Sequence, residues 1–151
     1  MTKIISYLGN LSLQIELDNI KISVVNFAKL EAGSNWSVIN HCHSDFEFHL
    51  VPRGRGYITI EGAELIVNKD EFYITGPYVM HSQVSDSKLP MEEYCLQCEI
   101  DFLGKNEGES KLFKEVLCAT YTSVFKDGYG AIKIYEEIIK EVSKKAPGYI
   151  L

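Results

Sequence analysis

The sequence predicts a mostly β domain: a small barrel followed by C-terminal helices. Apolar and polar residues alternate with a period of two from about Leu11 to Phe102, and turn-forming residues interrupt this alternation at short intervals. A helical period replaces it only after Gly104. A chain of 151 residues is one domain's worth of material. We therefore expect a jelly-roll-like barrel in residues 1–104, including an N-terminal arm, and a helical segment in residues 105–151.

The expected strands are short and follow one another closely. They cover residues 11–17, 22–26, 37–43, 46–52, 56–61, 64–67, 72–75, 79–84 and 94–102. The last is the clearest, because Tyr94, Leu96 and Cys98 alternate with polar or small residues, which predicts one buried face and one face toward water. Eight or more short strands with regular turns are typical of a sandwich or a barrel.

The segment after Gly104 changes character. Residues 105–110 are a polar break, residues 112–118 are expected to form a short helix, and residues 131–145 an amphipathic helix that Pro147-Gly148 ends. The apolar stripe of that helix consists of Ile132, Tyr135, Ile138, Ile139 and Val142. The chain then ends on apolar residues, which indicates a chain cut from a longer protein.

Composition excludes several classes of function. The 15 basic and 21 acidic residues give a net charge of −6 without a basic cluster, so this chain alone is not expected to bind DNA. No apolar run is long enough to cross a membrane and no signal peptide begins the chain, so we expect a cytoplasmic protein without membrane contact.

The four cysteines do not predict a disulfide framework. Cys95 and Cys98 have the spacing of a redox or zinc motif, but they fall on an expected strand, where their side chains point to opposite faces. No second such pair exists in the sequence. Free thiols are therefore the favoured interpretation.

Three histidines and a glutamate carry the expected chemistry. His41 and His43 are two residues apart on an expected strand, so their side chains project to the same side. Glu47 follows four residues later, past a bend, and a later strand supplies His81. Imidazoles and a carboxylate that converge inside a barrel suit a first-row transition metal such as Zn, Ni, Mn, Fe or Cu. The alternative is that these histidines are simply exposed or hydrogen-bonded near a strand end.

Three further residues are candidates for contacting a bound small molecule. His49 lies two residues beyond Glu47, and Gln83 two beyond His81, so in regular strands both face the same pocket. Trp36, the single tryptophan, is a candidate stacking surface at the mouth of the barrel. The alternatives are a solvent-exposed edge position for His49 and core packing for Trp36.

The pattern His-x-His-x3-Glu-x6-Gly, which His41, His43, Glu47 and Gly54 form, resembles the first motif of the cupin superfamily. Gly76-Pro77 and His81 resemble its second motif. The resemblance implies a cupin barrel whose three histidines and glutamate hold a metal. The second motif departs from the family pattern, since Gly-Pro-x-x-x-His replaces Pro-x-Gly-x-x-His, and this departure concerns the turn before His81.

A second resemblance covers nearly the whole chain. The segments around residues 47–62 and 71–82 and the tail at residues 138–149 are similar to the N-terminal effector-binding domain of AraC/XylS-type transcription regulators. This resemblance implies a non-catalytic sensor of a small molecule. A polar pocket with histidines fits a sugar, a sugar acid or another small polar metabolite. The resemblance also implies homodimers that pair through the C-terminal helices, with Ile139 as a candidate contact, and DNA binding only through a helix-turn-helix domain that this chain lacks. The alternative is a metal-dependent cupin enzyme of the dioxygenase or isomerase type.

Overall fold

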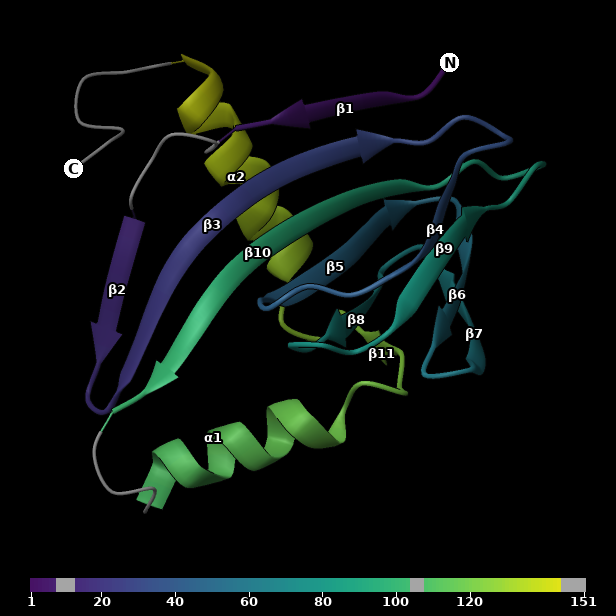
Figure 1. Cartoon of the computed structure of the whole chain (residues 1–151). Coiled ribbons are helices and arrows are strands. Elements are labelled where there is room, and N and C mark those ends of the chain that lie inside the picture. Colours follow the sequence, from purple (N-terminus) through teal and green to yellow (C-terminus); the bar gives the residue numbers. More distant parts are fainter. Residues whose placement is uncertain (8–12, 104–107, 145–151) are drawn as a thin grey trace.

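The chain folds into two antiparallel sheets that face each other and two helices that cover one of them (Figure 1). The computed structural model describes residues 1–7, 13–103 and 108–144. The first sheet has the order β1-β3-β10-β5-β8-β11, with β2 also paired to β3, and the second has the order β4-β9-β6-β7. The strands are β1 (Lys3–Ser6), β2 (Leu13–Leu17), β3 (Ile20–Glu31), β4 (Ser37–His41), β5 (Phe46–Arg53), β6 (Arg55–Ile60), β7 (Ala63–Asn68), β8 (Glu71–Thr75), β9 (His81–Ser85), β10 (Glu92–Phe102) and β11 (Phe125–Lys126).

The predicted class, a mostly β barrel followed by helices, is confirmed. Buried residues of both sheets meet between them in one cluster, in which Val51 and Tyr73 of the first sheet join Ile58, Ile60 and Val67 of the second. All five are at most 1% exposed. This cluster fills one part of the barrel with mostly aliphatic side chains, and buried polar side chains occupy another part.

Several boundaries differ from those expected. β3 is much longer than residues 22–26, because β10 pairs with it along its whole length and keeps it extended where its own sequence no longer alternates. The structure adds β1 and β11, and helix α1 (Gly108–Ala119) begins inside the expected polar break. The strand expected from residue 79 begins at His81. The expected features at residues 11, 12, 145 and 147–148 lie outside the described residues.

Strands β5 and β10 each have two different faces, and both are covered. Cys95 pairs with His49, and Gln97 with Glu47, on the face toward the barrel interior. The face that was expected to meet water on β10 is therefore interior at Cys95 and reaches solvent only at Glu99 and beyond. The opposite face carries the apolar residues of the alternation and lies against the helices.

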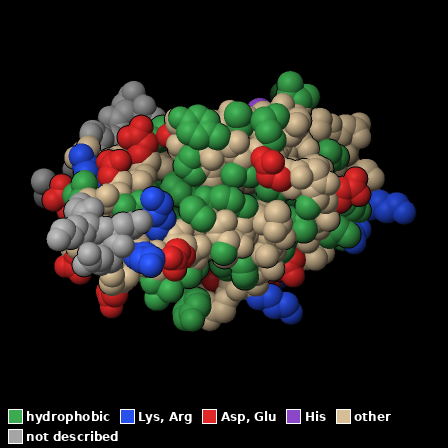
Figure 2. Space-filling view, turned by 60° about the horizontal axis from the view of Figure 1, so that its bottom comes forward, with side chains coloured by type: hydrophobic (Ala, Val, Ile, Leu, Met, Phe, Trp, Pro, Cys, Tyr) green, Lys and Arg blue, Asp and Glu red, His purple; other side chains and the backbone are tan. Residues whose placement is uncertain are grey.

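Helix α1 packs through Leu117, which is 4% exposed, on Phe46, Ile74 and Cys98 of the outer face. The two cysteines of the Cys-x-x-Cys pair therefore do lie on opposite faces, and all four cysteines are free thiols. Other apolar residues of α1, such as Leu112, remain exposed. Figure 2, which views the side on which α1 lies, shows hydrophobic side chains gathered across the middle of this face.

Helix α2 (Ala131–Lys144) lies across the same outer face of the sheet (Figure 1). Its first backbone N–H groups, those of Ala131 and Ile132, donate to the Asp127 carboxylate at 2.8 and 2.9 Å, which caps the helix. Ile132 joins Leu50 and Tyr94 in one buried cluster, and Tyr135 and Ile139 pack against this cluster.

Ile139, the candidate dimer contact, is partly buried and packs against the barrel. The helix turns different residues outward: Ile134 is 56% and Ile138 is 38% exposed. Among the described residues, no helix has the length and apolar character that crossing a membrane requires.

Candidate metal centre

The three histidines of the predicted site come together at one end of the second sheet. His41 ends β4 and His81 begins β9, and the register of these two strands sets them opposite each other. Their ring centroids are 4.3 Å apart, and the His43 ring, in the turn after β4, is 5.1 Å from that of His81. His81 is fully buried, whereas His41 and His43 are partly exposed, so the group opens toward solvent on one side.

All three rings are oriented in the same way by their own backbone. In each, Nδ1 lies 2.9–3.0 Å from the carbonyl oxygen of a residue two positions away. These carbonyls belong to Ile39, Asp45 and Val79. Because a carbonyl only accepts, the proton of each neutral ring is assigned to Nδ1, and Nε2 is left with a free lone pair. Metal-binding histidines are held by the same kind of hydrogen bond.

Glu47, at the start of β5, supplies the carboxylate. Its Oε2 lies 2.8 Å from His43 Nε2 and 3.4 Å from His81 Nε2. Both distances fall within ion-pair range. The Nε2 atoms of His43 and His81 are nevertheless buried without a hydrogen bond of acceptable geometry. Burial raises the pKa of Glu47, but its contacts with the His49 and His81 rings and the nearby imidazole charge outweigh burial and hold this pKa well below its usual range.

This arrangement fits a divalent transition metal. The buried Nε2 atoms of His43 and His81 lie beside the Glu47 carboxylate without a hydrogen-bond partner, and a cation between them would satisfy these groups. The potential ligand atoms of His41, His43 and His81 lie within 4.8 Å of one another, as do those of Glu47, His49 and His81. When bound, such a metal acts as a Lewis acid that polarises an oxygen ligand.

His49 lies behind this group rather than at a solvent-exposed edge, as the parity of β5 predicted. Its Nε2 is 3.3 Å from Glu47 Oε2, and its Nδ1 is 3.1 Å from Glu93 Oε1. Burial lowers the pKa of His49, but the charge of Glu93 and the contacts with Cys95 and Glu47 raise it well above its usual value. The ring therefore connects two carboxylates.

Gln83 also faces the interior, as predicted, and belongs to a buried polar network. Its side-chain nitrogen lies 3.3 Å from His49 Nδ1 and hydrogen-bonds to the Tyr73 hydroxyl. The Tyr73 ring stacks on His49 with centroids 4.4 Å apart and planes 5° from parallel, and its hydroxyl donates to Glu93 Oε2 at 3.3 Å. The network fixes the position of His49 on all sides.

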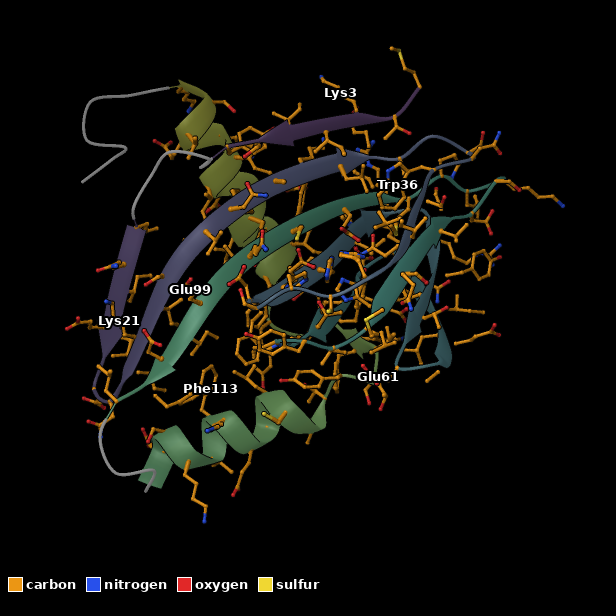
Figure 3. All side chains as sticks on the ribbon, viewed as in Figure 1. Lys3, Lys21, Trp36, Glu61, Glu99 and Phe113 are labelled. Atoms are coloured by element: carbon orange, nitrogen blue, oxygen red, sulfur yellow. The ribbon has the colours of Figure 1, made fainter. Side chains whose placement is uncertain are left out.

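Trp36 does not join these residues. It is partly buried and packs against the aliphatic cluster between the sheets. Figure 3 shows it at the end of the barrel away from Phe113 and α1. This contact agrees with core packing, the alternative to ligand stacking for Trp36.

Steric constraints explain why two positions of the predicted motifs are glycines. Gly54 has φ +75°, and a Cβ atom there would collide with the Pro90 carbonyl, so the tight turn from β5 to β6 admits no side chain. A Cβ at Gly76 would collide with the Tyr121 ring. In the reshaped turn before His81, Tyr78 takes φ 62° and its N–H donates to the His43 carbonyl at 2.7 Å. That turn therefore ties together the two motifs that supply the histidines.

Three residues of the site were missed by the analysis of the sequence: Tyr73, Glu93 and Cys95. Glu93 follows another glutamate before the apolar alternation of β10, which is typical of a solvated strand end, yet it is only 4% exposed. The alternation of side chains along the strand could have indicated this burial, because Glu93 shares a strand face with Cys95, and Cys95 pairs with His49.

Comparison with known proteins identifies a family. A family model described as an AraC-like ligand binding domain matches residues 24–118, which span most of the barrel and α1. No curated protein sequence matches the chain.

Solved structures with a similar fold are distant in sequence. A cupin protein from Bacteroides fragilis is 20% identical with a TM-score of 0.46, over 72% of this chain and 84% of its own. KdgF from Halomonas sp. is 13% identical with a TM-score of 0.43, over 57% and 85% of the two chains. A variant of oxalate decarboxylase from Bacillus subtilis is 12% identical with a TM-score of 0.43, over 82% of this chain and 41% of its own.

Proposed function

The chain belongs to the family of AraC-like ligand-binding domains, and we propose that it is the sensing domain of an AraC-type transcription regulator. It binds a small polar effector, carries out no reaction, and passes the binding event to a DNA-binding domain elsewhere in a longer regulator. Its net charge of −6 agrees with DNA contact outside this segment.

The observation that carries this proposal is that β5 and β10 each have one face in the barrel interior and the other face against α2. Glu47 and His49 point into the barrel, whereas Leu50, the next residue after His49, packs on α2. On β10, Glu93 points inward and Tyr94 contacts the same helix. A ligand that shifts the inner residues of these strands therefore shifts the surface on which α2 rests, without any intervening layer. Such coupling requires only that the effector bind one of the two arrangements more tightly.

The metal centre is part of the sensor. We infer that His41, His43, Glu47 and His81 hold Zn, Ni, Mn or Fe, because the unpartnered Nε2 atoms of His43 and His81 beside the Glu47 carboxylate favour a bound cation. His49 and Gln83 are the candidate contacts for the effector. Imidazoles, a carboxylate and an amide suit a ligand rich in hydroxyl or carboxylate groups, such as a sugar or a sugar acid.

The test combines binding with hydrogen exchange. Purified, metal-loaded protein is titrated calorimetrically with a panel of sugars and sugar acids, and hydrogen exchange in α2 is followed by mass spectrometry with the ligand that binds. We expect binding without change of the ligand and altered protection in α2. Ile139→Ala should reduce the change in α2 with little effect on affinity, whereas Ile134→Ala, at an exposed position of the same helix, should leave both intact. Binding that leaves α2 unaltered would contradict the sensor.

A metal-dependent cupin enzyme is the second candidate, of the dioxygenase or isomerase type. The observation that favours it is the partial exposure of His41 and His43, which leaves one side of the centre open to a substrate. Mass spectrometry of the ligand after incubation with metal-loaded protein, together with oxygen consumption, separates the two. Metal-dependent conversion that His43→Ala abolishes would replace the sensor with the enzyme.

A further inference from the structure

We propose that the barrel holds a second metal position, formed by His49 Nδ1, the Glu93 carboxylate and the Cys95 sulfur. It lies on the side of the His49 ring away from Glu47, since Nε2 faces Glu47 and Nδ1 faces Glu93. The three ligand atoms lie within 4.8 Å of one another. This position goes beyond the sensing function, because it requires neither the effector nor occupation of the first centre.

Backbone pairing brings these ligands together. In the register of β5 and β10, Cys95 lies directly opposite His49, so the two side chains leave the sheet side by side on its inner face. Glu93 comes two residues before Cys95 and shares that face. The three donors therefore stand on two neighbouring strands of the first sheet, which is a rigid support for a metal.

The carboxylate is held as a metal ligand is held. The Tyr73 hydroxyl donates to Glu93 Oε2 at 3.3 Å, which leaves Oε1 directed at His49 Nδ1, 3.1 Å away. Glu93 is 4% and His49 is 2% exposed, so water screens neither group. Partners of this kind orient metal-binding carboxylates and histidines.

The simpler alternative is a buried ion pair between His49 and Glu93. An ion pair does not involve a sulfur atom, whereas a metal can bind one, and Cys95 supplies a third donor atom at this position. When the metal binds, Cys95 loses its thiol proton and His49 its Nδ1 proton, both to solvent, and bonds from sulfur and nitrogen to the metal replace them. Imidazole, thiolate and carboxylate together favour Zn²⁺ or Co²⁺ over the oxygen-seeking Mg²⁺ and Ca²⁺.

Titration with Co²⁺ tests the proposal, because a cobalt–thiolate bond gives a charge-transfer band in the near ultraviolet. Metal content after dialysis is measured in parallel by elemental analysis. Wild-type protein should bind two equivalents and show the band. Cys95→Ser should keep one equivalent and lose the band, whereas Cys42→Ser, at an exposed thiol between two ligands of the first centre, should keep both. His43→Ala should lose one equivalent and keep the band.

The variants separate this position from the first centre. Retention of one equivalent by Cys95→Ser also shows that the variant is folded, and Cys95→Ala should behave in the same way. Tyr73→Phe should weaken the second equivalent about 10- to 100-fold, the usual cost of losing an orienting partner. One equivalent without a band in the wild type, or a band that survives Cys95→Ser, would overturn the second position while leaving the first centre intact.

Discussion

Replacement of one histidine of the first metal centre should remove most of the stabilisation that a metal bound at this centre provides. His43→Ala removes one of the four ligands, a group 2.8 Å from Glu47 Oε2. A ligand present at 100 times its Kd stabilises the folded state by about 2.7 kcal/mol. For a domain of this size, each kcal/mol raises Tm by about 2–4 °C, so wild-type protein at that Zn²⁺ concentration should melt about 5–10 °C higher than the metal-free protein.

The loss in the variant follows from the same relation. Losing an orienting partner of a ligand weakens a metal about 10- to 100-fold, so losing the ligand itself should cost at least ~100-fold. The Zn²⁺ concentration then equals the Kd of this centre in the variant, and the stabilisation that the centre provides falls to about 0.4 kcal/mol, or about 1–2 °C. Differential scanning fluorimetry with and without a chelator measures both shifts.

The matched control is Cys42→Ser. This side chain lies between His41 and His43 in the chain, but it is exposed and belongs to none of the ligand groups. It should keep the full wild-type shift. A wild-type Tm that Zn, Ni, Mn and Fe all leave unmoved would refute the reasoning, and so would a shift in His43→Ala equal to that of the wild type.

Two further predictions concern the frame around the site. Gly54→Ala should lower the free energy of unfolding in urea by at least ~2 kcal/mol, because it adds a clash with the Pro90 carbonyl to a positive φ. Gly62→Ala, with φ +82° but open space around it, should lower this free energy by only about 1 kcal/mol. Equal costs would show that the clash is relieved. The pKa of Asp86 is held below its ordinary value of 3.8 by hydrogen bonds from the Tyr57 hydroxyl, backbone N–H groups and Arg55. A carboxyl whose pKa is lowered in the folded state contributes stability above pH 3.8, and this stability is lost as the pH falls below that value. Asp86→Asn should therefore flatten the acid side of a plot of urea midpoint against pH. An unchanged acid side would contradict this role.

That the four residues of the candidate metal centre lie together could be predicted because they are close in the chain or belong to a motif. His41, His43 and Glu47 lie within seven residues, so strand parity and one turn suffice to bring them together. His81 was found only through the second motif, since its approach to His41 depends on the pairing of β4 with β9. Local pattern carries no information on such long-range pairing.

The inner part of the site could not be predicted for the same reason. Glu93 interacts with His49, 44 residues away, and Tyr73 reaches Glu93 from β8. On its own strand, Glu93 is an ordinary charged residue, and Tyr73 is an ordinary apolar one. Their roles arise because β5 lies between β8 and β10, so that inner-face residues of three strands meet. The alternation along β10 was predicted correctly, but the polar face was assigned to water because the local sequence does not show that the second sheet covers this face.

The exposed face of α2 leads to a last prediction, on self-association. Ile134 and Ile138 are four residues apart, so they form one apolar strip on the side of the helix away from the barrel. We expect weak dimers that pair through this strip and bury about 1,200 Å² or less, the low end for specific interfaces. Ile138→Glu should shift sedimentation toward the monomer and leave Tm unchanged.

Ile139→Glu is the contrasting variant. Its side chain is partly buried against the cluster of Leu50, Tyr94 and Ile132, so the added charge should be partly buried and lower Tm, whatever the state of association. The different responses of two neighbouring residues would show which face of α2 serves the fold and which serves the pairing. A strict monomer at high concentration would remove the interface, and a tight dimer unaffected by Ile138→Glu would mean that pairing runs through the barrel. Either result would leave α2 as a cover for β5 and β10. The proposed sensor would then have to act, through this helix, on the DNA-binding domain of its own chain.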